Sequence, residues 1–151
     1  MIQLQRNYSN NYNNGNTANE GELSQPYTLT YEEYLTLARI PHCDGVPARV
    51  INALHLRVGH TELSIEKIAS DLNFTKRTLQ RRLQSQNTNF AQLRDDLRFH
   101  YAIKYLNDDN LSVDLVSRAL DFSDRTSFTN AFKRWTGLSP STFRKLFRDI
   151  A

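Results

Sequence analysis

The stretch IASDLNFTKRTLQRRL, residues 68–83, returns in altered form about 48 residues later as VSRALDFSDRTSFTNAF, residues 116–132. In each copy a branched apolar residue is followed by a leucine one helical turn later. Asn73 and Asp121 come next, and these residue types adopt left-handed backbone conformations more readily than other non-glycine residues. Because a fixed internal period defines the structural unit, the sequence predicts that one small module occurs twice.

Each module continues with an aromatic residue, a hydroxyl residue suited to a helix N-cap, and a second helix. The inward apolar residues of that helix lie four apart: Leu79 and Leu83 in the first copy, Phe128 and Phe132 in the second. We expect Thr75 and Ser123 to be the caps. A helix, a short turn and a capped second helix together predict a helix-turn-helix.

The length and composition of the chain limit its class. A chain of 151 residues suggests one compact domain or two small ones that share a core. Only 39% of the residues are hydrophobic, and no apolar run approaches the roughly 20 residues that span a bilayer. No secretory signal is visible, and the single cysteine, Cys43, rules out an internal disulfide. We therefore expect a soluble, cytoplasmic protein.

The net charge of +3 is unevenly distributed along the chain. Residues 46–151 hold 17 Lys and Arg against 11 Asp and Glu, whereas residues 1–45 hold 2 against 5. The basic excess thus accompanies the repeated module. It favours nucleic-acid binding through the release of phosphate counterions, although many basic surfaces are merely solvated.

Two kinds of segment precede the first module. Residues 1–29 are polar, with seven asparagines in the first twenty positions, and we expect them to form a disordered tail. Residues 30–45 are expected to form a short helix, opened by a capping box at Thr30 and Glu33, and a linker. A further helix is predicted from about residue 48 to residue 58.

Residues 46–151 complete an all-α fold in this interpretation. They comprise a first helix-turn-helix at 64–86, a long linker helix at 89–107, a second helix-turn-helix at 112–135 and a terminal helix at 139–148. A linker helix of about 18 residues is ~27 Å long. Ser139 and Pro140 supply a cap and an N-terminal proline for the last helix.

The second helix of the first module has one apolar face and one polar face. The residues opposite Leu79 and Leu83 are Arg77, Gln80, Arg81 and Gln84. Glutamine pairs with adenine and arginine with guanine in the major groove, so this face has the groups that base reading requires. A solvated polar face fits the spacing equally well, but the preceding helix and turn favour DNA recognition.

The corresponding helix of the second module is less basic. It buries Phe128, Phe132 and Trp135, and its outward residues are Arg125, Thr126, Thr129, Asn130 and Lys133. Threonine and asparagine can contact bases or phosphates, so this helix is expected to anchor and register the protein; the alternative is that it only packs. The helix starts near Ser64, Thr75, Ser112 and Ser123 are candidate phosphate contacts as well as caps.

These residues resemble the DNA-binding domain of the AraC/XylS family of bacterial transcription regulators. The resemblance covers roughly residues 48–147 and rests on an ordered set: Arg98, Ala102, Leu106, Leu111, Ser112, Val116, Asp121, Phe122, Ser123, Asp124, Phe128, Phe132, Lys133, Gly137, Leu138, Ser139, Pro140, Phe143 and Arg144. It implies seven helices, with two helix-turn-helix units joined by the long linker helix. It also implies that both recognition helices enter successive major grooves on one side of promoter DNA.

The resemblance assigns roles to individual residues. Base-contacting positions fall on Arg77, Gln80 and Arg81 in the first unit and on Arg125, Thr126 and Asn130 in the second. Backbone-contacting positions fall on Thr75, Lys76, Gln84, Ser112, Ser123, Thr129 and Lys133. The implied partners are double-stranded promoter DNA and RNA polymerase in the bacterial nucleoid, without a cofactor, a metal, a membrane or a small-molecule effector bound by this chain.

The chain departs from the family pattern in several places. Asp121 replaces the glycine usual in the second turn, Ser117 replaces a small apolar residue, and Asn130 stands where relatives often carry a basic residue. These changes predict weaker binding or different sequence specificity in the second unit. Residues 1–45 are too short for the effector-binding barrel of many members, so the chain resembles a small single-domain member or a C-terminal fragment.

Enzymatic alternatives find little support in the sequence. Ser64 and Lys67 fit the S-x-x-K pattern of serine acylases, but no companion motif occurs and Ser64 is suited to capping a helix. The four histidines show no metal-ligand spacing. A different class of function remains open, namely a protein-interaction module or antagonist built on helix-turn-helix units without specific DNA binding.

Overall fold

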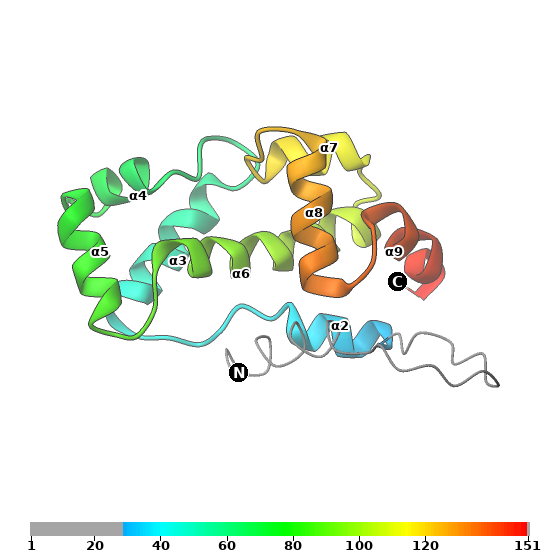
Figure 1. The fold of residues 1–151 in the computed structure, drawn as a ribbon, viewed down its shortest axis with the longest axis horizontal. Helices are drawn as coiled ribbons and strands as arrows, with labels where there is room; N and C mark the ends of the chain where they lie inside the picture. The colour runs from blue at the N-terminus through cyan, green and yellow to red at the C-terminus, as the bar shows by residue number, and fades with distance from the viewer. Residues whose placement is uncertain (1–28, 151) are drawn as a thin grey trace, which may run out of the picture.

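The computed structural model describes residues 29–150, apart from the side chain of Ile150, so most of the expected tail at 1–29 lies outside the described residues. The elements of the described part are α2 (Tyr31–Leu37), α3 (Gly45–Arg57), α4 (Ile65–Asp71), α5 (Lys76–Gln84), α6 (Phe90–Ile103), a π-helix η1 (Lys104–Asp108), α7 (Val113–Ala119), α8 (Arg125–Thr136), α9 (Pro140–Phe147) and a 3₁₀ helix η2 (Arg148–Ile150). Residues 29–150 contain no strand, which confirms the all-α prediction. Helices α3 to α9 are the seven expected helices, and α2 is the extra N-terminal one (Figure 1).

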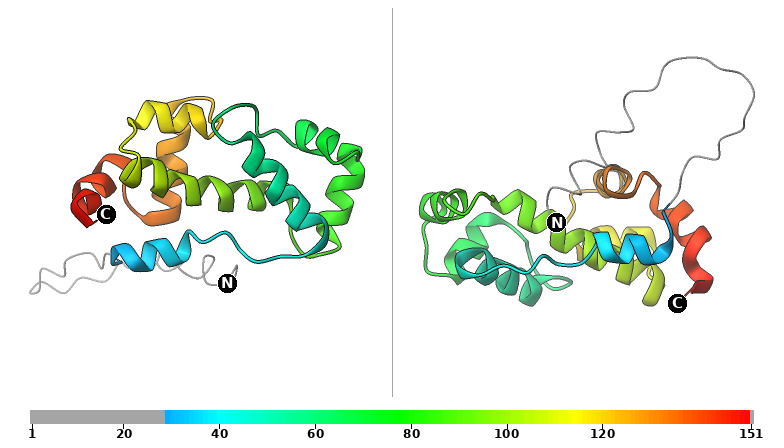
Figure 2. Two further views of the ribbon diagram at one scale, coloured as in Figure 1. Left: turned by 180° about the vertical axis from the view of Figure 1, so that it is seen from behind. Right: turned by 90° about the horizontal axis from the view of Figure 1, so that it is seen from below.

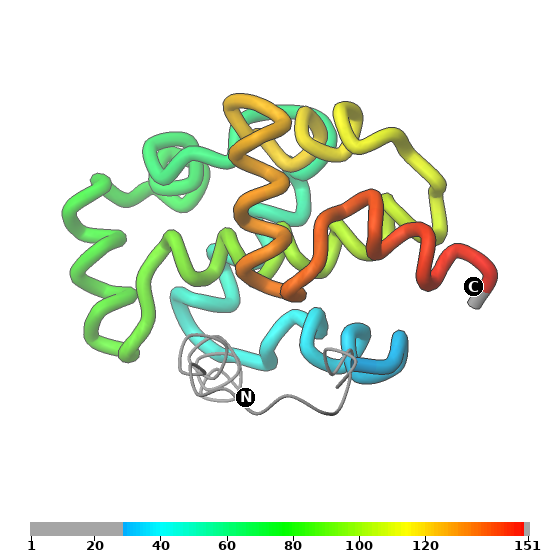
Figure 3. The backbone as a smooth tube through the Cα atoms, turned by 45° about the vertical axis from the view of Figure 1, so that its right-hand side comes forward, coloured from blue at the N-terminus to red at the C-terminus, as the bar shows by residue number. Residues whose placement is uncertain are grey.

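Helix α6 and its continuation η1 form the axis of the molecule. Helices α3, α4 and α5 form a first unit at one end, and α7, α8 and α9 form a second unit at the other (Figure 3). Both α3 and α8 pack against α6. One continuous core therefore joins the two units, from Leu54 in α3 through Leu97 in α6 to Phe132 in α8, all three fully buried.

The long helix is built largely as the sequence indicates. The side chain of Asn89 caps α6 by accepting a hydrogen bond from the backbone NH of Gln92 at 2.9 Å. Apolar residues at helical spacing then face the core as far as Leu106, which lies in the π-helical turn. The hydrogen-bonding pattern widens there, and the chain leaves η1 toward α7.

Helix α3 begins earlier than the sequence suggests. The predicted start was residue 48, after Pro47, but the helix begins at Gly45 with Pro47 as its third residue. Proline is tolerated in the first turn because the amide it lacks has no intrahelical acceptor there. Pro47 therefore lies in the first turn of α3 and does not mark the boundary of the helix.

Helix α2 and the segment after it run along both units (Figure 2, left). The capping box at Thr30 and Glu33 is present, as predicted. Tyr34 packs against Phe143 and Phe147 of α9 with ring centroids 5.3 and 5.7 Å apart, and its hydroxyl donates to the Thr136 carbonyl at 3.0 Å. The N-terminal helix is thus fastened to the second unit before the chain crosses to α3.

Candidate nucleic-acid interface

The two modules share one turn geometry. Asn73 and Asp121 have φ angles of 59° and 57°, so both adopt the left-handed conformation that the sequence predicted. In the first turn the NH of Phe74 donates to the carbonyl of Ala69 at 2.9 Å, and in the second the NH of Phe122 donates to Ser117 at 3.0 Å. Positions 48 residues apart therefore form the same hydrogen bond, so the two turns begin in the same way.

The caps of the recognition helices α5 and α8 differ. Thr75 caps α5 as expected, accepting from the NH of Thr78 at 3.1 Å. The cap of α8 is Asp124 rather than Ser123, because Asp124 Oδ1 accepts from the NH of Ser127 at 2.6 Å. This hydrogen bond lowers the pKa of the Asp124 carboxyl. The expectation for Ser123 was wrong because the second turn is one residue longer.

The extra residue changes how the two recognition helices correspond. Leu79 and Leu83 of α5 and Phe128 and Phe132 of α8 are fully buried, and they lie 49 rather than 48 positions apart. With that spacing the outward pairs are Lys76 with Arg125, Arg77 with Thr126, Gln80 with Thr129, Arg81 with Asn130 and Gln84 with Lys133. All of these side chains are exposed except the half-buried Thr129.

Both recognition helices lie along one side of the molecule. In Figure 1 they run in the same direction, and in Figure 2, right, each is seen nearly end-on at the same side. Their buried faces belong to the shared core, so their polar faces point away from it. The structure thus brings the outward residues of α5 and α8 to one surface.

Equivalent ion pairs occur at the start of both recognition helices. Lys76 Nζ lies 3.1 Å from Glu66 Oε1, and Arg125 Nη1 lies 3.7 Å from Asp114 Oδ1. Glu66 and Asp114 are each the second residue of the helix that precedes the turn. The repeat therefore includes a charge pair at the edge of the candidate interface, with both partners accessible to solvent.

An arginine holds each turn, but with different strength. Arg98 of α6 donates to the carbonyls of Leu120 at 2.7 Å and Asp121 at 2.6 Å, and its guanidinium lies 4.1 Å from the Phe122 ring centroid. Arg98 is only 6% exposed, and burial is the main cause that lowers its pKa to about 10. A buried arginine with these partners remains charged at neutral pH.

The first turn has a weaker counterpart that the sequence analysis missed. Arg49 of α3 donates to the Leu72 carbonyl at 3.5 Å, and its guanidinium lies 5.3 Å from the Phe74 ring centroid. Arg49 is exposed, unlike Arg98. Its spacing of 49 from Arg98 is the signal that could have revealed it, and it extends the repeat to three helices, with α3 matching α6.

The predicted hydroxyl caps are present at the other helix starts. Ser64 accepts from the NH of Lys67 at 3.3 Å, and Ser112 accepts from the NH of Leu115 at 3.2 Å. Ser64 is therefore bound to its own helix, in agreement with the capping interpretation. In residues 29–150 no group of three or more His, Cys, Asp or Glu is placed to hold a metal ion, and no helix there could cross a bilayer.

Comparison with known proteins agrees with this geometry. A family described as helix-turn-helix domain matches residues 68–146. The ornithine utilization regulator of Pseudomonas aeruginosa is 34% identical over 109 residues, which are 72% of this chain and 32% of that protein. The crystal structure of the transcriptional regulator CdpR from the same species is 34% identical, with a TM-score of 0.61 over 67% of this chain and 32% of that one.

A further structure shows the fold alone. A DNA-binding transcriptional dual regulator from Escherichia coli K-12 has a TM-score of 0.61 at 19% identity, over 70% of this chain and 95% of that chain. Two helix-turn-helix units on one axial helix define a class of DNA-binding domain. The chain belongs to the AraC/XylS-type family of helix-turn-helix transcription regulators. Its relatives are regulators rather than enzymes, and the chain spans about a third of the length of the ornithine utilization regulator, 32%.

Proposed function

We propose that this protein is a sequence-specific, double-stranded DNA-binding transcription regulator that inserts α5 and α8 into successive major grooves of a promoter. The observation that carries the proposal is the location of two polar helix faces on one side of the axis formed by α6 and η1. The major grooves on one side of B-DNA recur about every 34 Å, so a single chain with this shape suits two of them. A bacterial, cytoplasmic location follows from the same proposal.

We assign base contacts in the first unit to Arg77, Gln80 and Arg81. Arg77 and Arg81 offer paired donors for guanine, and Gln80 offers a donor and an acceptor for adenine. In the second unit the base-contacting residues that the family resemblance implies are Arg125, Thr126 and Asn130. The correspondence of Arg125 with Lys76, and of Thr129 with Gln80, favours a phosphate contact for Arg125 and a base-edge contact for Thr129.

The backbone-contacting positions that the family resemblance implies are Thr75, Lys76, Gln84, Ser112, Ser123, Thr129 and Lys133; of these, Thr129 is the one for which the correspondence with Gln80 favours a base edge instead. Lys76 and Arg125 are paired with Glu66 and Asp114 in the free protein. On DNA these cations would exchange their carboxylate partners for phosphates. Because phosphate contacts release counterions, affinity is expected to fall steeply with salt.

Selection of binding sites from random duplexes, followed by footprinting, tests this proposal. We expect two protected major-groove segments about one helical turn apart and a strong dependence of affinity on salt. A single protected segment would reject the two-groove mode. Absence of duplex binding even at low salt would reject DNA binding altogether and favour the protein-interaction alternative.

A protein contact is a second candidate function, and one surface feature favours it. Leu56 of α3 is 82% exposed and lines an open hollow of about 460 Å³ together with Ala53 and Leu72. We propose RNA polymerase as the partner, because a promoter-bound regulator acts on that enzyme. Leu56→Ser is expected to leave promoter affinity unchanged and to reduce activation in reconstituted transcription; unchanged activation would reject this surface as the contact.

A further inference from the structure

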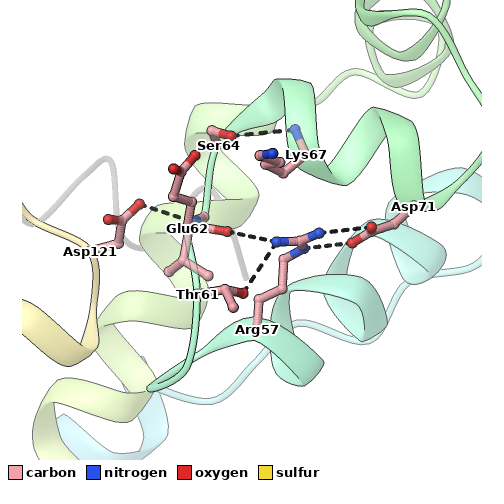
Figure 4. A network of polar contacts seen from close by, with 8 residues as sticks. Arg57, Thr61, Glu62, Ser64, Lys67, Asp71 and Asp121 are labelled. Carbon is pink, nitrogen blue, oxygen red and sulfur yellow. Dashed lines mark hydrogen bonds and ion pairs between the residues drawn. The ribbon is translucent and has the colours of Figure 1, made fainter.

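The turn of the second unit is hydrogen-bonded directly to the loop between α3 and α4 of the first unit. The backbone NH of Leu63 donates to Asp121 Oδ2 at 2.8 Å (Figure 4). Close by, the NH of Gly59 donates to the carbonyl of Ala119 at 3.0 Å. Leu63 lies just before α4, and Asp121 lies in the turn between α7 and α8, so these bonds cross from one helix-turn-helix to the other.

Helix α6 holds both sides of this junction. Arg98 donates to the backbone carbonyl of Asp121 at 2.6 Å, and Arg94 donates to the carbonyl of Leu63 at 3.2 Å. Leu63 and Asp121, which bond to each other, are thus each also hydrogen-bonded to an arginine, and the two arginines lie on neighbouring turns of α6. The junction is a closed arrangement of side chains and backbone rather than an isolated surface contact.

The network continues to the turn of the first unit. Arg57 donates to the Glu62 carbonyl at 3.4 Å and to the Thr61 hydroxyl at 3.2 Å. The same guanidinium makes two hydrogen bonds to the carboxylate of Asp71, at 2.6 and 2.8 Å. Asp71 is the last residue of α4, immediately before the first turn. Figure 4 shows this path from Asp121 through the loop to Asp71.

The residue type at position 121 matters for this path. A φ of 57° favours Gly, Asn or Asp at this position. Glycine satisfies the backbone conformation but has no acceptor for the Leu63 NH. Aspartate satisfies both requirements, so the choice of residue that fits the turn also decides whether the two units are bonded to each other.

We propose that Asp121 is a positioning residue that fixes the separation and relative orientation of α5 and α8 by joining the second turn to the loop before α4. The inference rests on the proposed two-groove function and deepens it. A protein with this bond discriminates sharply between duplexes whose two sub-sites are correctly and incorrectly spaced. Without the bond, the units tilt more freely about α6 and tolerate altered spacing.

The test compares Asp121→Gly with Asp121→Asn on duplexes carrying the selected site. Glycine fits the positive φ and removes the acceptor, whereas asparagine fits the same φ and keeps one. Inserting one base pair between the sub-sites should weaken wild type and Asp121→Asn equally. For Asp121→Gly the penalty should be smaller by about fivefold, as expected for one lost hydrogen bond. Equal penalties in all three proteins would overturn the proposal.

A second measurement tests the positioning role of Asp121 without DNA. Spin labels at Gln84→Cys in α5 and Lys133→Cys in α8, in a Cys43→Ser background, report the distance distribution between the recognition helices. Wild type and Asp121→Asn should give narrow distributions, and Asp121→Gly a broader one. Identical widths would reject the positioning role. If instead the widths differ but wild type binds only one groove, the two-groove function fails while the positioning role stands.

Discussion

The turns of the two helix-turn-helix units begin with the same backbone geometry but are held by different contacts. In the second unit a buried Arg98 makes two short hydrogen bonds to the turn carbonyls. The Ser117 hydroxyl also donates to the carbonyl of Asp124, the cap of α8, at 3.0 Å. In the first unit Ala69 replaces Ser117, and the exposed Arg49 reaches the turn at 3.5 Å.

The unit whose turn is held more tightly is not the unit whose recognition face carries more arginine and glutamine. The first unit has a loosely held turn and a recognition face rich in arginine and glutamine. The second has a tightly held turn and a milder face of threonine and asparagine. Two of the departures from the family pattern, Ser117 and Asp121, form hydrogen bonds that hold the second turn. We infer that the second unit supplies rigidity and register, while the first supplies most of the base specificity.

The largest expected effect concerns the two arginines that hold the turns. Arg98→Met should lower the free energy of unfolding by about 2–4 kcal/mol, because it removes two charge-assisted hydrogen bonds and a cation–π contact in a buried site. Arg49→Met, the matched change in the first unit, should cost less than about 1 kcal/mol, as expected for a weak, exposed contact. Urea denaturation measures both values; equal losses would show that the two turns are held alike.

The next effect concerns base discrimination. Arg81→Ala should reduce discrimination between the selected site and a mutated site by about 1–3 kcal/mol, since arginine pairs with guanine through two donors. Asn130→Ala, at the corresponding position of α8, should cost less. Lys133→Ala should weaken binding to all duplexes alike. Titrations against both sites separate these outcomes, and a larger loss from Asn130→Ala would reverse the assignment of specificity.

Local patterns predicted much of this structure. The spacing of Leu79 and Leu83, and of Phe128 and Phe132, indicated both recognition helices, and Asn73 and Asp121 indicated the left-handed turns. These features depend on residues close in sequence, where periodicity and backbone preference act directly. Both expected architectures, one compact domain or two small ones, have a common core, but the residues that join the units in it belong to distant segments, which local patterns do not identify.

Other features depended on such distant contacts. The sequence gives no indication that the Asp121 carboxylate meets Leu63, 58 residues away, or that Arg98 reaches across to Leu120. The repeat without a gap predicts Ser123 as the cap of α8, but the second turn holds one more residue than the first, and the cap is Asp124. The candidate DNA contacts follow from the polar helix faces, the helix caps and the family resemblance, and their roles are predictions.

A third prediction concerns Asp96, a second buried charged residue of α6. Unlike Arg98, Asp96 has few hydrogen-bond partners. Asp96 is 5% exposed; Oδ1 accepts from Gln92 at 2.9 Å, and Oδ2 has no hydrogen-bond partner among the described residues. Burial is the main cause that raises its pKa from 3.8 to about 6. The folded state therefore binds this proton more tightly than the unfolded state, and stability is lost as pH rises through 4 to 6.

Asp96→Asn removes that cost. The variant should be more stable than wild type by about 1–2 kcal/mol at pH 7.5, and the difference should vanish near pH 4, where the wild-type carboxyl is protonated. Urea denaturation at several pH values measures the difference. If the difference in free energy of unfolding stays constant across these pH values, the Asp96 carboxyl does not titrate in that range. Helix α6 would then tolerate the buried Asp96 as well as it tolerates the buried Arg98.

The smallest expected effect tests the equivalence of the charge pairs at the two helix starts. Glu66→Gln frees Lys76, and Asp114→Asn frees Arg125, so each change removes a carboxylate that competes with DNA phosphate for the cation. Each should raise affinity for any duplex about twofold at low salt, with less gain at high salt, because exposed pairs are weak and screened. Similar gains would indicate that Arg125 contacts phosphate, as is proposed for Lys76. A change in site preference with Asp114→Asn alone would instead place Arg125 against a base, and the second unit would then contribute to specificity as is proposed for the first.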